Sequence, residues 1–263
     1  MPTYTPLINN TSAVYNGYPV KLGSTPDHLS KRPILSKVGN KKIVFICIGA
    51  STPGQISTQL EKLGNALVDV DILNCCVGAQ DINDWLMPDG AGWKNVTSTL
   101  SANGYTYADV QGIIMCHDDL RDGSNAFPAS AIALKNKMKD FVSQSKGKCP
   151  NLKHVELFSR LCEYKVTDTK FVTPSGYHNG WSNKFLVEDC IANNSRLNNV
   201  WVNDSCGYLW TDGETVRSDG FAFKFAWMKQ RQTSIHLDTT KEGDDVCAKF
   251  ILDNMKRTYA EFK

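Results

Sequence analysis

An unbroken apolar run from Ile43 to Ile48, followed at once by Gly49-Ala50-Ser51, constrains the fold of this chain more than any other segment. Such a run without polar alternation is typical of a strand that is buried on both faces of a parallel sheet. Similar runs recur along the chain, and segments with helical spacing of apolar residues separate them. We expect strands over 43–48, 70–77, 110–116, 154–158 and 200–202, and helices over 55–67, 129–142, 177–191 and 244–259.

This alternation of strands and helices predicts an α/β fold, with a parallel sheet of about five strands covered by helices on both faces. Ligands bind such sheets at the carboxyl ends of the strands. Ser51, Gly78, the pair Asp118-Asp119 and Arg160 each follow a predicted strand. We therefore expect these residues to gather at one edge of the sheet.

The first 40 residues are rich in Thr, Asn, Ser, Pro and Tyr and show no clean periodicity. They predict an extended arm or an irregular cover over residues 1–40, while residues 41–263 form one domain. The arm would suit docking onto a second copy of the chain or onto another assembly partner.

The charge pattern argues against binding to nucleic acid or membrane. The formal net charge is only +2 in 263 residues, and the Lys and Arg residues are scattered rather than clustered. The longest apolar stretches are strand-sized, so no transmembrane helix is expected. The N-terminus has neither the basic nor the apolar part of a signal peptide. Together with the nine cysteines this favours an intracellular or virion-associated location.

The cysteines fall into two groups. Cys47, Cys75, Cys76 and Cys116 lie in or beside predicted strands, where we expect reduced thiols that pack as small hydrophobic groups. The others are more scattered and leave room for a disulfide. They are Cys149, Cys162, Cys190, Cys206 and Cys247. No Cys-x-x-Cys pair exists, and we expect no metal site and no organic cofactor.

Ser51 and His236 have the settings that nucleophilic catalysis needs. A serine on a strand-to-helix turn exposes its hydroxyl near backbone N–H groups that can stabilise an oxyanion. His236 lies just before the last predicted helix, on a loop that can reach across the top of a parallel sheet. If the two side chains meet, the chain is a serine hydrolase.

With Ser51, Gly78 and His236 in this order, the chain resembles the SGNH (GDSL-like) hydrolases, which are three-layer α/β/α esterases with a flavodoxin-like sheet. The likeness is greatest to a branch found in secreted bacterial proteins and covers roughly residues 42–258. It is carried by Gly49-Ala50-Ser51, by Gly78-Ala79-Gln80-Asp81-Ile82-Asn83-Asp84-Trp85, and by segments 159–164, 175–188, 207–213 and 217–220.

The resemblance implies a role for each matching residue. Ser51 would be the nucleophile, and the backbone N–H groups of Ser51 and Gly78 would bind the oxyanion. His236 would act first as the general base and then as the acid for the leaving alcohol.

Two positions depart from the family pattern. Thr233 stands where the family has an acidic residue, three positions before its histidine, and Asp118 lies where the family has an oxyanion-binding Asn. Loss of the orienting acid lowers turnover by about 10⁴-fold in serine proteases. The site would then be a Ser–His dyad, a triad with Asp219 or Asp238 as relocated acid, or a degenerate site.

Other polar residues have less specific settings. We expect His117, Asp118, Asp119 and Asp122 to form a solvated loop rather than a metal cluster. Arg160 suits either a substrate contact or a salt bridge to a loop carboxylate. Most of the six tryptophans are expected to pack in the core, with one or two left for stacking on a sugar ring.

These patterns give two main hypotheses of different classes. The first is a serine esterase, in particular a carbohydrate O-acetylesterase, acting on an acylated small molecule or glycan. The second is a degenerate SGNH-like scaffold that binds glycans or serves as a structural module in a virion or at a cell surface. A flavodoxin-like nucleotide binder is less favoured, because the first turn lacks a Gly-rich phosphate fingerprint.

Overall fold

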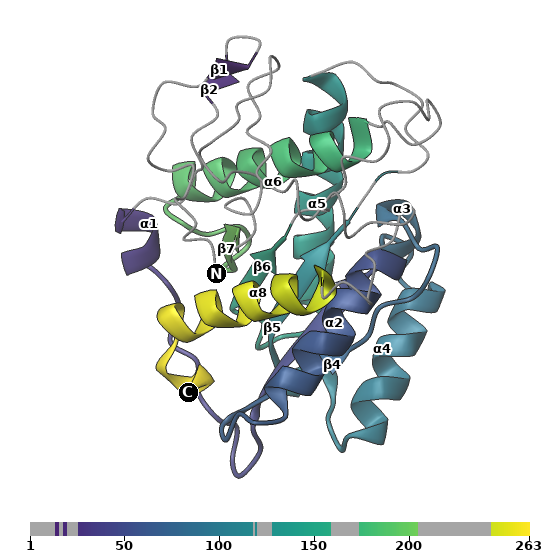
Figure 1. Ribbon diagram of the computed structural model, residues 1–263, viewed down its shortest axis with the longest axis vertical. Coiled ribbons are helices and arrows are strands. Elements are labelled where there is room, and N and C mark those ends of the chain that lie inside the picture. Colours follow the sequence, from purple (N-terminus) through teal and green to yellow (C-terminus); the bar gives the residue numbers. More distant parts are fainter. Residues whose placement is uncertain are drawn as a thin grey trace.

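The computed structural model describes residues 14–15, 18–19, 26–117, 119, 128–158, 174–204 and 243–263. At its centre is a five-stranded parallel sheet in the order β4-β3-β5-β6-β7 (Figure 1). The first strand of the sheet lies second in this order, which is the flavodoxin-like arrangement. The strands are β3 (Ile43–Gly49), β4 (Val70–Asn74), β5 (Val110–Cys116), β6 (His154–Leu157) and β7 (Trp201–Asp204).

Helices cover both faces of this sheet. On one face α2 (Ser51–Gly64) and α8 (Gly243–Thr258) pack against each other, as Figure 1 shows. The other face carries α3 (Ile82–Trp85), α4 (Ala91–Ala102), α5 (Ala129–Lys148) and α6 (Pro174–Ala192). The α/β class and the three-layer α/β/α arrangement expected from the sequence are thus confirmed.

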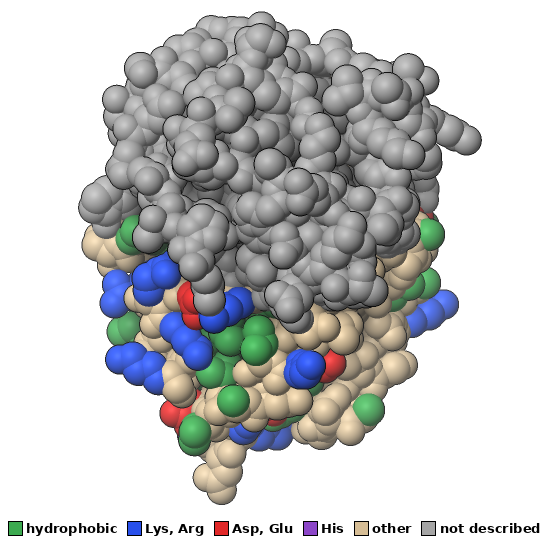
Figure 2. Space-filling view, in the orientation of Figure 1, with side chains coloured by type: hydrophobic (Ala, Val, Ile, Leu, Met, Phe, Trp, Pro, Cys, Tyr) green, Lys and Arg blue, Asp and Glu red, His purple; other side chains and the backbone are tan. Residues whose placement is uncertain are grey.

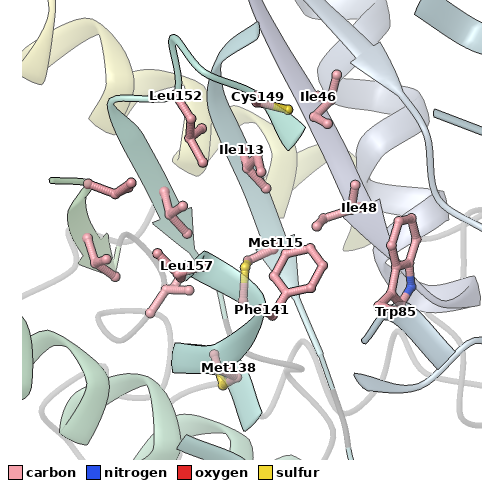
Figure 3. Packing of buried hydrophobic residues seen from close by; sticks show 14 of the residues in the cluster. Ile46, Ile48, Trp85, Ile113, Met115, Met138, Phe141, Cys149, Leu152 and Leu157 are labelled. Atoms are coloured by element: carbon pink, nitrogen blue, oxygen red, sulfur yellow. The ribbon is translucent and has the colours of Figure 1, made fainter. Parts of the chain in front are cut away.

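The two faces of β3 supply the two halves of the core. Every residue of β3 and of β5 is buried, which explains the absence of polar alternation in both runs. Successive side chains of a strand point to opposite faces, so Ile46 and Ile48 join the α3–α6 side while Phe45 joins the α2–α8 side. Figure 3 shows the first cluster, in which Ile48, Met115, Phe141 and Trp85 lie near one another.

Shorter elements complete the described part of the chain. They are the two-stranded pair β1 (Val14–Tyr15) and β2 (Tyr18–Pro19), the helix α1 (Pro26–Ser30), and 3₁₀ turns over Tyr107–Asp109 and Ala260–Phe262. His28 of α1 is buried, stacks on Trp201 and donates from Nε2 to the Val202 carbonyl at 2.8 Å. Part of the predicted arm therefore packs against the edge strand β7, while the boundary at residue 40 stays a prediction.

The predicted elements are present with shifted ends, and besides α1 two further helices were not predicted. The first of these, α3, begins with a capping box in which the Asp81 side chain accepts from the Asp84 N–H while the Asp84 side chain accepts from the Asp81 N–H. The second, α4, buries Trp93, Val96 and Leu100 at helical spacing. The strand expected over 70–77 ends at Asn74, and in the loop that follows Cys75 and Val77 still donate hydrogen bonds to β3.

The described surface carries scattered charge. On the face shown in Figure 2, Lys and Arg side chains are interspersed with hydrophobic and acidic ones. Within the described ranges, no helix is long and apolar enough to cross a membrane. Six cysteines in these ranges are free thiols, and Cys47, Cys75 and Cys116 are buried as expected. Burial raises the pKa of Cys75 and of the half-buried Cys76 to about 12, which makes both thiols unreactive.

The close approach of β5 to β3 gives a test of this packing. Gly112 lies opposite Phe45, and a β-carbon on Gly112 would overlap the Phe45 ring. We expect Gly112→Ala to lower the free energy of unfolding by about 1–3 kcal/mol in urea denaturation, since overpacking strains a dense core. The control is Gly147→Ala in α5, where an added β-carbon meets open space and stability should not fall. Equal stability of the two variants would contradict this packing.

Candidate active site

Three of the predicted site residues gather at the carboxyl edge of the sheet. Ser51 follows β3, Gly78 follows β4, and Asp119 follows β5. These three strands are adjacent, with β3 in the middle. After β3 the chain forms β4 on one side of that strand and then β5 on its other side. The carboxyl edge of these strands is therefore a topological switch point, which is where ligands bind in open α/β sheets.

Ser51 is the first residue of α2 and is half-buried. Ala50 precedes it as the N-cap and offers no side-chain hydrogen bond, while the Gly54 N–H donates to the Ala50 carbonyl at 2.9 Å. The backbone N–H groups of a helix's first turn carry a partial positive charge. A developing anion beside Ser51 would therefore be stabilised by the start of α2.

Gly49 is required by packing at the end of β3. Its φ is 147°, which favours glycine. A β-carbon there would lie 2.6 Å from the Cys116 carbonyl oxygen and 2.7 Å from Cβ of Pro53. The glycine of the Gly-Ala-Ser sequence thus lets β3, β5 and α2 meet closely.

Backbone hydrogen bonds to β3 hold the segment before Gly78 at the carboxyl end of that strand. The Cys75 N–H donates to the Cys47 carbonyl at 2.9 Å, and the Val77 N–H donates to the Gly49 carbonyl at 3.0 Å. Gly78 follows directly, next to the turn that presents Ser51. The segment before Gly78 is thus fixed to the end of β3, two residues before Ser51, while contact between Ser51 and Gly78 stays a prediction.

Gly78 itself does not adopt a left-handed conformation. The Gln80 N–H donates to the Val77 carbonyl at 3.3 Å, which closes a turn, and the positive φ of 60° belongs to Ala79. A positive φ at only the third position is the pattern of a type II turn. Among the described residues, a β-carbon added to Gly78 would meet nothing within 4 Å.

The loop after β5 differs from the predicted solvated loop. His117 and Asp119 are both buried. The Asn83 side chain donates to Asp119 at 2.9 Å, and Lys137 of α5 forms an ion pair with the same carboxylate. The expectation of a solvated loop is therefore wrong for these two residues, because partners on α3 and α5 compensate the burial of the carboxylate.

His117 lies in an aromatic setting. Its ring centroid is 5.7 Å from that of Trp85 and 5.2 Å from that of Phe141. Burial lowers the pKa of His117 to about 3, so the ring is neutral at physiological pH. Asn83, Lys137 and this aromatic cluster were not identified from the sequence. The only local signal was the Asp81-x-x-Asp84 spacing, which predicts a helix start.

The remaining predicted site residues are Asp118, Arg160, Asp219, His236 and Asp238, and all lie outside the described residues, as does Thr233. Contact between Ser51 and His236 stays a prediction, as do the candidate acids and the oxyanion role of Gly78. Trp85, Trp93 and Trp201 are buried in the core as expected.

The neutral state of His117 predicts acid sensitivity. Its pKa in the folded chain is about 3, below the ordinary value of 6.5, so the unfolded chain binds the proton more tightly. The contribution to stability is therefore present above about pH 6.5 and is lost as the pH falls toward 3. At about pH 5 the loss is on the order of 2 kcal/mol.

The measurement is urea unfolding at about pH 7 and about pH 5. We expect His117→Gln to lose less stability between the two pH values than the wild type, whatever the substitution costs at neutral pH. Parallel pH dependence of the two proteins would show that His117 does not carry this effect.

Comparisons with known proteins find similar structures but no matching family model or curated sequence. No family model and no curated protein sequence matches the chain. A protein of Bacteroides fragilis, provisionally assigned as an acylhydrolase, has a similar structure with a TM-score of 0.50 and 13% identity, over 88% of this chain and 93% of that one.

Two further structures are similar at lower TM-scores. One, provisionally assigned as an SGNH hydrolase of Slackia heliotrinireducens, has a TM-score of 0.43 and 10% identity, over 82% of this chain and 100% of that one. The other is a family two carbohydrate esterase of Cellvibrio japonicus, with a TM-score of 0.45 and 14% identity, over 88% of this chain and 64% of that one. At these identities the similarity is one of fold: the chain shares a three-layer α/β/α architecture with the Bacteroides fragilis protein.

Proposed function

We propose that this protein is a serine ester hydrolase, in particular a carbohydrate O-acetylesterase. The observation that supports this most is the position of Ser51. It begins a helix directly after β3, beside the hydrogen-bonded segment that leads to Gly78. The sequence resemblance adds His236 as the base and an acylated glycan or small molecule as the substrate.

The proposed reaction proceeds through an acyl-enzyme. Ser51 Oγ attacks the ester carbonyl carbon while its proton passes to His236, and the oxyanion accepts hydrogen bonds from the N–H groups of Ser51 and Gly78. The intermediate then collapses, the C–O bond to the alcohol breaks, and His236 returns the proton to that alcohol. Water, deprotonated by His236, attacks the acyl-enzyme, and the acid leaves as Ser51 recovers its proton.

The described part of the site suits this charge development. The start of α2 offers a positive partial charge where the oxyanion would form. Nearby, the Asp119 carboxylate is neutralised by its ion pair with Lys137, which reduces its repulsion of an oxyanion. The mechanism needs neither a metal ion nor an organic cofactor.

A catalytically degenerate scaffold is the second candidate. Thr233 stands at the position of the orienting acid, and His117 and Asp119 are engaged in packing and in an ion pair. A scaffold would keep the sheet edge for binding a glycan or an assembly partner without an activated serine. An enzyme would use Asp219 or Asp238 as a relocated acid or would work as a Ser–His dyad.

The first test is the reactivity of Ser51. We expect a fluorophosphonate probe to label the wild type and to fail with Ser51→Ala and with His236→Ala, because both an intact nucleophile and its base are needed. Ser143→Ala is the matched control, since this α5 serine hydrogen-bonds only within its own helix among the described residues. Circular dichroism checks that each variant is folded.

The substrate is tested by acetate release from acetylated glycans under the same conditions. Labelling and release that both depend on Ser51 would support the esterase. A folded wild type that is neither labelled nor active would instead support the scaffold.

The oxyanion role of Gly78 gives a second prediction. Proline is favoured at the second position of a type II turn, so Gly78→Pro should keep the turn while removing the N–H donor. We expect kcat to fall by about 10²–10³-fold, as for loss of one oxyanion donor. Gly78→Ala keeps the donor and adds a methyl group that meets no described atom within 4 Å, so kcat should fall far less in this variant. Equal kcat values for the two variants would contradict the role of this N–H group.

A further inference from the structure

Asn74, the last residue of β4, connects the two segments that carry the proposed oxyanion donors. Its side-chain Nδ2 donates to the Gly54 carbonyl at 3.3 Å and to Thr58 Oγ1 at 3.1 Å, both in α2. Its Oδ1 accepts from the Cys76 N–H at 3.1 Å. One amide group thus binds α2 on one side and the segment after β4 on the other.

Each partner lies close to a proposed catalytic group. Gly54 belongs to the first turn of α2, where its N–H binds the residue that precedes Ser51. Cys76 lies two residues before Gly78, and the intervening Val77 N–H is bound to the end of β3. The Asn74 side chain therefore closes a bridge between the Ser51 turn and the Gly78 turn.

Other contacts fix Asn74 itself. Its backbone is paired with Cys47 of β3, and its N–H donates to Glu61 Oε1 in α2 at 3.2 Å. The side chain is half-buried, and its two ends have opposite polarity, as the Gly54 carbonyl and the Cys76 N–H require. A carboxylate could accept from Cys76 but would repel the Gly54 carbonyl.

We infer that Asn74 is a positioning residue of this active site, which fixes the Ser51 and Gly78 N–H groups relative to each other. The inference rests on the proposed ester hydrolysis, because it concerns the same oxyanion. Asn74 does not contact the substrate in this role. It acts through the two segments that it joins.

The expected effect follows from the geometry of oxyanion binding. Donors must lie about 2.7–3.1 Å from the oxyanion, and a misplacement of about 1 Å can cost about 10²-fold in rate. Loss of the bridge should therefore lower kcat by about 10- to 100-fold. KM should change little, because the oxyanion forms only in the transition state.

The experiment compares Asn74→Ala and Asn74→Asp with the wild type in hydrolysis of p-nitrophenyl acetate, below the unfolding temperature of each protein. Asn74→Asp keeps the acceptor for Cys76 but loses the donor to α2, so it should also lower kcat. The matched control is Asn151→Ala. This residue donates to the Ala108 carbonyl at 2.7 Å near the opposite edge of the sheet, and its loss should leave kcat unchanged.

A double-mutant cycle separates positioning from a general loss of stability. If Asn74 acts through the Gly78 N–H, Asn74→Ala should cost much less in a Gly78→Pro background than in the wild type. A purely structural effect would cost the same in both backgrounds. Amide hydrogen exchange should also become faster at Cys76 and Gly78 in Asn74→Ala, and not along β6.

The outcomes distinguish this inference from the proposed function. A wild type that hydrolyses no ester overturns both. An active wild type with unchanged kcat in Asn74→Ala overturns the role of Asn74 alone, as does full additivity with Gly78→Pro. A lower kcat at constant KM, with non-additivity and faster local exchange, supports it.

Discussion

The close contact at the end of β3 is the constraint on which the rest of the site depends. Gly49 lies between the Cys116 carbonyl of β5 and Pro53 of α2, with no room for a side chain. Its own carbonyl accepts from Val77, which leads into the Gly78 turn. One residue therefore sets the relative positions of two strands, one helix and one loop. Any side chain at this position would push β5 and α2 away from β3 and so shift the segment that carries Ser51.

The sheet could be predicted from the sequence because its signal is local. The apolar runs of β3 and β5 have no polar alternation, and both strands are buried on both faces. The positions of Ser51 and Gly78 follow from that, since residues after parallel strands share one edge of the sheet. The α4 helix was missed because Thr97, Ser98 and Thr99 have low helix propensity, and its stability comes from packing of Trp93 and Leu100.

The surroundings of Asp119 could not be predicted, because its partners are distant in the sequence. Considered alone, a run of His and Asp residues after a strand predicts a solvent-exposed loop. In the folded chain, Asn83 and Lys137 reach the Asp119 carboxylate from two helices, and Trp85 and Phe141 enclose His117. These partners are brought to the loop only by the folded structure, so the residue types in the loop alone predict exposure where the structure shows burial.

The proposed oxyanion donors are backbone N–H groups, so the fold alone does not distinguish an enzyme from an inactive scaffold. Backbone N–H groups at strand ends and helix starts are supplied by the architecture, whatever the side chains are. The fold similarity to the Bacteroides fragilis protein at 13% identity therefore concerns the backbone architecture and not the reactivity of any side chain. A degenerate scaffold would retain the same backbone geometry around Ser51. The reactivity of the Ser51 hydroxyl, which depends on His236 and its orienting group, is thus the property that distinguishes an enzyme from a scaffold.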